Sequence, residues 1–77
     1  MDPRKIHQHI DRNMARILQF EHELGTLFVL PKNWHFRVYR WLALFRPEVL
    51  IGDAERITAE VVFDVCLRLD FREKHPL

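Results

Sequence analysis

The sequence predicts a small α+β domain spanning residues 1–77, in which two helices cover the apolar face of a long C-terminal strand. Two patterns carry the prediction. Apolar residues recur at helical spacing before residue 46, whereas apolar and polar residues alternate with a period near two over residues 57–72. Gly and Pro residues separate these segments. An all-α three-helix bundle is the alternative, because residues 57–72 also fit a helix in part.

The first helix is expected over residues 3–24. Asp2 can cap its start, Pro3 suits the first helical position, and Gly25 is a natural stop. The apolar stripe of this helix consists of Ile6, Ile10, Met14, Ile17 and Leu24. Residues 26–30 could be a short strand, an extended linker or a last turn of the same helix; their composition and flanks favour the strand.

A second helix is expected over residues 34–45. Asn33 can cap it, and Pro47 disfavours α geometry at the residue before it, so the helix should end near residue 45. Its apolar face would bury Trp34, Val38, Trp41, Leu42 and Phe45. Part of this stretch also alternates as a strand would. The following connection should place Val49, Leu50 and Ile51 under the core, and Asp53 could cap a short helical turn.

Residues 57–72 are interpreted as the strand. Every second residue is apolar, namely Ile57, Ala59, Val61, Phe63, Val65, Leu67, Leu69 and Phe71, while six of the eight alternate positions are polar. Sixteen residues is long beside a mean strand of about five or six. A strand also needs a neighbour for its backbone hydrogen bonds. Residues 26–30 could supply part of that neighbour and a second copy of the strand the rest, which favours a homodimer.

Composition points to one soluble, cytoplasmic domain. The chain has 77 residues, of which 48% are hydrophobic, and so small a body leaves apolar surface that favours a homo-oligomer or a bound partner. Cys66 is the only cysteine, which excludes an internal disulfide and suits a reducing compartment. No run of 18 apolar residues is present, so no membrane span is expected.

Catalytic and metal-binding patterns are weak. His7 and His9 would point to opposite sides of a helix, and no HxxxH spacing occurs. The chain contains no serine and no Gly-rich loop, and Cys66 has no neighbouring histidine in the sequence. The sequence therefore predicts a non-enzymatic protein with no cofactor and no metal site.

The basic, aromatic middle is the candidate binding site. Residues 31–47 contain four bases and no acid, whereas residues 48–77 contain seven acids and four bases. The two regions could pair within one chain, across a dimer or with separate partners. We predict a protein-interaction module, such as a small inhibitor or adaptor, with nucleic-acid binding as the alternative. The candidate contact residues are Lys32, Arg37, Tyr39, Arg40, Leu44 and Arg46.

Overall fold

The computed structural model describes the backbone of residues 3–74 and the side chains of residues 10–74. Within that part of the chain the fold is helical and contains no β-strand, so the predicted α+β class is wrong. The alternative prediction, an all-α bundle, agrees with the observed class, although it expected three helices. The elements are α1 (Pro3–Leu18), α2 (Glu21–Leu27), α3 (Trp34–Phe45), the 3₁₀ helix η1 (Pro47–Leu50) and α4 (Ala59–Arg68).

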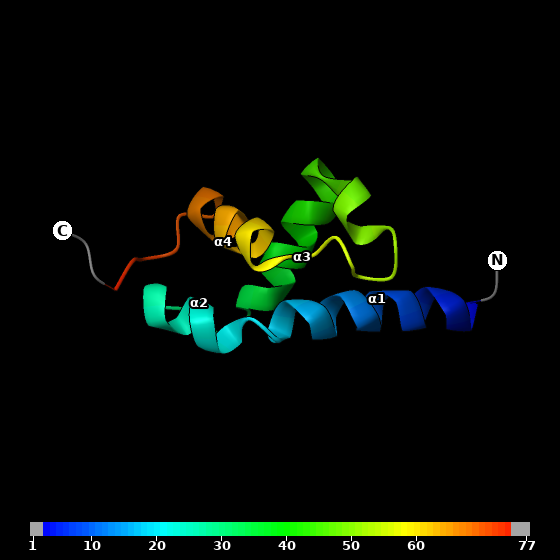
Figure 1. The fold of residues 1–77 in the computed structure, drawn as a ribbon, viewed down its shortest axis with the longest axis horizontal. Helices are drawn as coiled ribbons and strands as arrows, with labels where there is room; N and C mark the ends of the chain where they lie inside the picture. Colours follow the sequence, from blue (N-terminus) through cyan, green and yellow to red (C-terminus); the bar gives the residue numbers. More distant parts are fainter. Residues whose placement is uncertain (1–2, 75–77) are drawn as a thin grey trace.

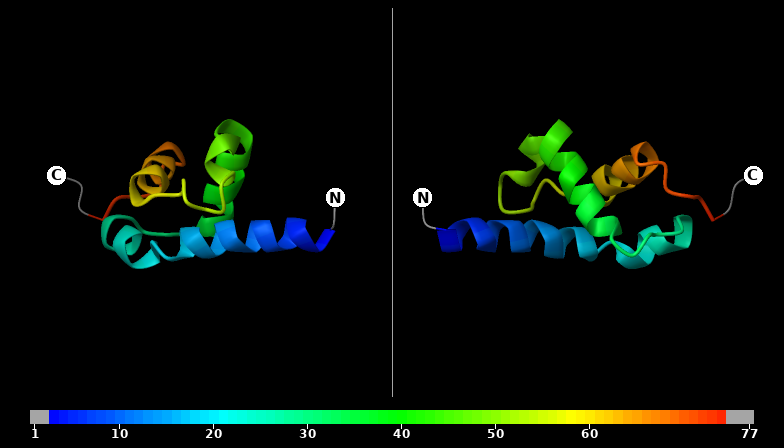
Figure 2. Two further views of the ribbon diagram at one scale, coloured as in Figure 1. Left: turned by 45° about the vertical axis from the view of Figure 1, so that its right-hand side comes forward. Right: turned by 180° about the vertical axis from the view of Figure 1, so that it is seen from behind.

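The helices form an elongated body that measures 49 × 20 × 18 Å. In Figure 1, α1 and α2 follow each other along one long side, while α3 and α4 lie on the other. Figure 2 shows α3 rising steeply from α1, with α4 beside it and above α2. The N-terminal turns of α1 extend past the rest of the molecule. The hydrophobic core therefore lies toward the α2 end of the molecule, between helices α1 and α2 on one side and helices α3 and α4 on the other.

The first helix ends earlier than predicted. It stops at Leu18, a two-residue turn follows, and a separate helix then continues to Leu27 with Gly25 inside it. The turn is held by the backbone N–H of Phe20, which donates to the carbonyl of Ile17 at 3.1 Å. No glycine or proline marks this break, which is why the pattern did not show it. The predicted cap Asp2 and the side chain of Ile6 lie outside the described residues.

Residues 26–30 do not form the predicted strand. Thr26 and Leu27 complete α2, and the extended residues after them make a single antiparallel bridge, between Phe28 and Glu73. The N–H of Val29 donates to the carbonyl of Arg72 at 2.7 Å, and the N–H of Lys74 donates to the carbonyl of Leu27 at 2.9 Å. These bonds tie the end of the described chain to the end of α2.

The predicted helix over residues 34–45 is confirmed as α3. Asn33 precedes it as expected, but its side chain makes no capping hydrogen bond. Trp34, Val38 and Leu42 are buried, and Trp41 is half-buried. The predicted burial of Phe45 is wrong: its side chain is 65% exposed. The last turn of α3 lies at the end of the helix farthest from α1, so neither α1 nor α2 covers it (Figure 2).

The predicted strand over residues 57–72 is instead helix α4 with short flanks. Its buried residues are Val62, Val65 and Cys66, followed by the half-buried Leu69, and this i, i+3, i+4, i+7 spacing is helical. Thr58 caps the start, since its Oγ1 accepts a hydrogen bond from the N–H of Val61 at 3.2 Å. A helix satisfies its backbone groups internally and removes the need for the missing neighbouring strand.

Three polar side chains of α1 hold the connection between η1 and α4. Asn13, which is fully buried, donates through Nδ2 to the carbonyl of Leu50 at 3.1 Å. Arg16 Nε donates to the carbonyl of Ile57 at 3.0 Å, and Arg12 forms an ion pair with Asp53. Asp53 therefore does not cap a helix as predicted. It lies in the left-handed backbone region, as do its neighbours Gly52 and Ala54.

The same connection reaches the core only in part. Val49 and Leu50 are buried, as predicted, whereas Ile51 is exposed, contrary to the prediction. η1 ends at Leu50, and the extended backbone of Ile51 carries its side chain outward. Ala54 and Ile57 complete this edge of the core.

Replacing Thr58 with valine should destabilise the protein by about 1 kcal/mol, because valine keeps the shape but removes the oxygen that caps α4. Urea denaturation followed by far-UV circular dichroism measures the change. Thr58→Ser keeps the acceptor and should retain most of the stability. Equal midpoints for wild type and Thr58→Val would show that the cap contributes nothing.

Candidate partner-binding surface

The exposed side of α3 combines large apolar side chains with arginines. Phe36, Arg40 and Leu44 follow one another at four-residue spacing and therefore lie on one side of the helix, with Arg37 at its edge. Phe36 is 61% exposed and Leu44 is 67% exposed. No other element covers this side of α3 in the described part of the chain, so it is available to a partner.

A groove of about 340 Å³ runs along one flank of this exposed side. Its lining comes from α3, from Asn33 directly before α3 and from Leu69 directly after α4. Trp41 and Leu69 are half-buried and belong to the edge of the core, whereas Leu44 and Phe45 are exposed. We call the groove together with Phe36 the α3 surface; its residues are Asn33, Phe36, Arg37, Arg40, Trp41, Leu44, Phe45 and Leu69.

Two arginines, one on this surface and one beside it, stack on aromatic rings. The guanidinium of Arg37 lies over the ring of Phe71, 5.0 Å from its centroid. Arg68 lies over the ring of Trp41 at 5.8 Å and also forms an ion pair with Asp64 at 2.9 Å. Such cation–π contacts hold the long arginine side chains in place. The contact with Phe71 does not neutralise the charge of Arg37, whereas Asp64 offsets that of Arg68.

Arg37 and Arg40 have no acidic partner among the described side chains. The ion pairs within residues 10–74 are Arg12–Asp53, Arg46–Glu48 and Arg68–Asp64, and none of them uses either residue. The α3 surface therefore presents two uncompensated positive charges beside exposed Phe and Leu side chains. This combination suits a partner that offers carboxylates and an apolar anchor.

The structure brings together three of the six predicted contact residues, Arg37, Arg40 and Leu44. Lys32 is exposed but does not line the groove, and Arg46 is engaged by Glu48 at 3.4 Å. Tyr39 is half-buried and packs against the core, on a different side of α3 from Arg37 and Leu44. The contact set on this surface is therefore narrower than the sequence suggested.

Sequence reasoning missed five members of this surface, among them Asn33, which was expected only as a helix cap. Phe36 lies one turn before Arg40, so the helical spacing alone could have placed it there. Phe45 and Trp41 were assigned to the core, although one is exposed and the other only half-buried. Leu69 could not be predicted as a member of this surface, because the strand interpretation placed it on the apolar face that the two helices would cover.

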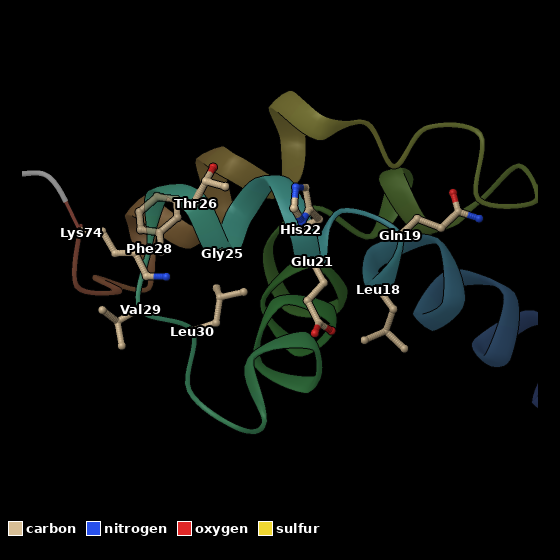
Figure 3. A pocket seen from close by; sticks show the side chains of 10 residues that line it. All are labelled: Leu18, Gln19, Glu21, His22, Gly25, Thr26, Phe28, Val29, Leu30 and Lys74. Carbon is tan, nitrogen blue, oxygen red and sulfur yellow. The ribbon is translucent and has the colours of Figure 1, made fainter.

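A second concavity, of about 850 Å³, lies beside α2 and is broad and open. Figure 3 shows its side chains spread along α2 and the segment after it, from Gln19 at one end to Lys74 at the other. Glu21 and His22 are among them, but the labelled side chains do not converge on one point. This arrangement is unlike a site that positions a substrate between an acid and a base.

The one thiol of the chain is not an activated nucleophile. Cys66 is fully buried among the core residues of α4, and burial raises the pKa of its thiol to about 12. Reactive cysteines show the opposite environment, which is partly exposed and electropositive. Within residues 10–74 no three His, Cys, Asp or Glu side chains are grouped so that they could hold a metal ion. His7 and His9 lie outside those residues.

Comparison with protein-family models, with curated proteins and with solved structures gives no match to this chain. Among the described helices, none is both long enough and apolar enough to cross a membrane. The functional assignment therefore depends on the geometry of the chain itself.

Proposed function

We propose that this chain is a non-enzymatic protein-interaction module that binds an acidic, apolar segment of a protein through the α3 surface. The observation that supports it most is the pairing of Arg37 and Arg40, which have no acidic partner within residues 10–74, with the exposed Phe36 and Leu44. Aromatic and arginine side chains are the residues that most often dominate binding energy at protein interfaces.

The small number of exposed aromatic rings and of unpaired arginines on the α3 surface favours a protein partner over a nucleic acid. Proteins that bind single strands present free aromatic faces on which bases stack. Here Arg68 lies over the ring of Trp41 and Arg37 lies over the buried ring of Phe71, which leaves Phe36 and Phe45 as the exposed aromatic side chains of the α3 surface. Arg37 and Arg40 could also contact only a few phosphates, and affinity for nucleic acid grows with the number of phosphates that a protein neutralises.

A role as a small adaptor or inhibitor in the cytoplasm is the specific form of this proposal. The chain offers a compact recognition surface, and Cys66 is its only cysteine, which suits a reducing compartment. The buried, high-pKa thiol and the dispersed side chains beside α2 support a role without catalysis.

The test is capture of partners from a native cell lysate treated with nuclease, read by mass spectrometry. The wild-type chain should capture a protein in stoichiometric amount, and Arg37→Glu with Arg40→Glu should abolish that capture. Reversing two charges at an interface places like charges together and should weaken binding on the order of 100-fold. Circular dichroism should remain unchanged, because both side chains are exposed.

The matched control is Arg56→Glu with Arg72→Glu, which changes the net charge equally at exposed positions outside the α3 surface. Because Arg56 also donates a hydrogen bond to the carbonyl of Glu48 at 3.1 Å, circular dichroism should show that this control is folded. This control should keep full capture. Equal loss in both variants would show an effect of net charge alone and would contradict the proposal. Material that is captured only without nuclease would assign the surface to nucleic acid instead.

A further inference from the structure

A second apolar groove lies on a different side of the molecule, between α2 and α4. It has a volume of about 270 Å³, and its surface is mostly apolar. Leu27 is 46% exposed and Phe63 is 36% exposed, so large apolar side chains reach solvent from both helices. We call it the α2–α4 groove; its residues are Phe20, Glu23, Leu24, Leu27, Ala59, Glu60 and Phe63.

The charges of this groove are opposite to those of the α3 surface. Glu23 and Glu60 are exposed, and neither carboxylate takes part in an ion pair within residues 10–74. The α3 surface carries Arg37 and Arg40, which are equally uncompensated. Each surface thus offers a pair of like charges beside exposed apolar side chains, and the two pairs have opposite sign. Arg16, whose guanidinium lies over the ring of Phe20 at 5.2 Å, adds one positive charge at the edge of the α2–α4 groove.

The two surfaces cannot meet within one molecule. On α4, Ala59, Glu60 and Phe63 line the α2–α4 groove in the first two turns, whereas Arg68, the last residue of the helix, stacks on Trp41 at the α3 surface. The two grooves share no lining residue and lie toward opposite ends of α4. Because both are fixed within one packed body, the charges of one surface can reach those of the other only in a second copy.

We propose that the α2–α4 groove binds the α3 surface of a second copy, so that the chain self-associates head to tail. Phe36 and Leu44 of one copy would lie against Leu27 and Phe63 of the next, with Arg37 and Arg40 facing Glu23 and Glu60. This inference rests on the proposed function and names the partner of the α3 surface. Because the two contacting surfaces differ, the contact is heterologous and leaves a free surface at each end.

The test is sedimentation equilibrium of the purified, nucleic-acid-free chain over about a thousand-fold range of concentration. Wild type should self-associate. Arg37→Glu with Arg40→Glu places carboxylates on both surfaces, and Glu23→Lys with Glu60→Lys places cations on both. Each variant should raise the dissociation constant on the order of 100-fold. The chain with all four reversals exchanges the two charges and should regain self-association.

Charge-matched controls are Arg56→Glu with Arg72→Glu for the first variant and Glu55→Lys with Glu73→Lys for the second. Both should associate as wild type does, and circular dichroism should show that every variant is folded. A wild type that stays monomeric overturns the inference, as does a folded four-fold variant that fails to regain association.

The two proposals fail separately. A monomeric wild type that still captures another protein through Arg37 and Arg40 overturns self-association and leaves the interaction module standing. A monomeric wild type that captures no protein overturns both. Self-association that the charge reversals do not weaken overturns the assignment of either surface to it.

Discussion

Replacing Phe28 with alanine should remove a large part of the free energy of unfolding. Phe28 is 1% exposed and is the largest of the fully buried side chains. Its ring lies 5.4 Å from that of Phe63, so it joins the end of α2 to α4. Removing a buried phenylalanine side chain costs about 3–5 kcal/mol. A domain of this length has a free energy of unfolding of only about 4–12 kcal/mol.

Urea denaturation, followed by tryptophan fluorescence and circular dichroism, measures this loss. Phe36→Ala is the matched control, because it makes the same chemical change at a side chain that is 61% exposed. That control should change the free energy of unfolding by less than about 0.5 kcal/mol. Similar midpoints for the two variants would contradict the core position of Phe28.

The free energy of unfolding should fall as the pH rises above about 9, through the titration of Cys66. In the folded protein, burial holds the pKa of this thiol at about 12, against an ordinary value of 9.0. Between these values the unfolded chain loses the thiol proton and the folded chain keeps it, so rising pH favours unfolding. The expected slope is about 1.4 kcal/mol per pH unit, and this contribution is fully present below pH 9.

Denaturant midpoints at several pH values from 8 to about 11 measure this slope, and Cys66→Ala should lack that part of it. A second readout is the reaction of the thiol with a disulfide reagent at about pH 8. It should be on the order of 1,000-fold slower in the folded protein than in denaturant, since the thiolate reacts and is scarce when its pKa is raised. Rapid reaction of the native protein would contradict the burial of Cys66.

Helix α3 could be predicted because its signals are local. Asn33 before it, Pro47 after it and the spacing of Trp34, Val38 and Leu42 lie within one short stretch, and the structure follows them. The strand prediction failed because residues 57–72 satisfy two periods at once. The period of two counts Phe63 and Leu67 as core, yet both are exposed, whereas Val62 and Cys66 are buried.

The decisive information was the arrangement of the rest of the chain. A strand of that length needs a neighbouring strand along its whole length. Residues 26–30 supply only one bridge, at Phe28, because Thr26 and Leu27 belong to helix α2. The same misassignment concealed the part of the candidate site that lies outside α3. Arg37, Arg40 and Leu44 follow from the spacing within α3, but Leu69 and Arg68 join them only once residues 59–68 form a helix beside it.

The bridge between Phe28 and Glu73 has a consequence for the order in which the fold is acquired during synthesis. The two residues are 45 positions apart, and the buried Phe71 precedes this pairing directly. A ribosome makes the chain from its N-terminus, at roughly 5–20 residues per second. Phe28 is therefore synthesised about 2–9 seconds before the segment that covers it exists. During that interval the nascent chain exposes Phe28 and its apolar neighbours, which is when aggregation or capture by a chaperone is most favourable.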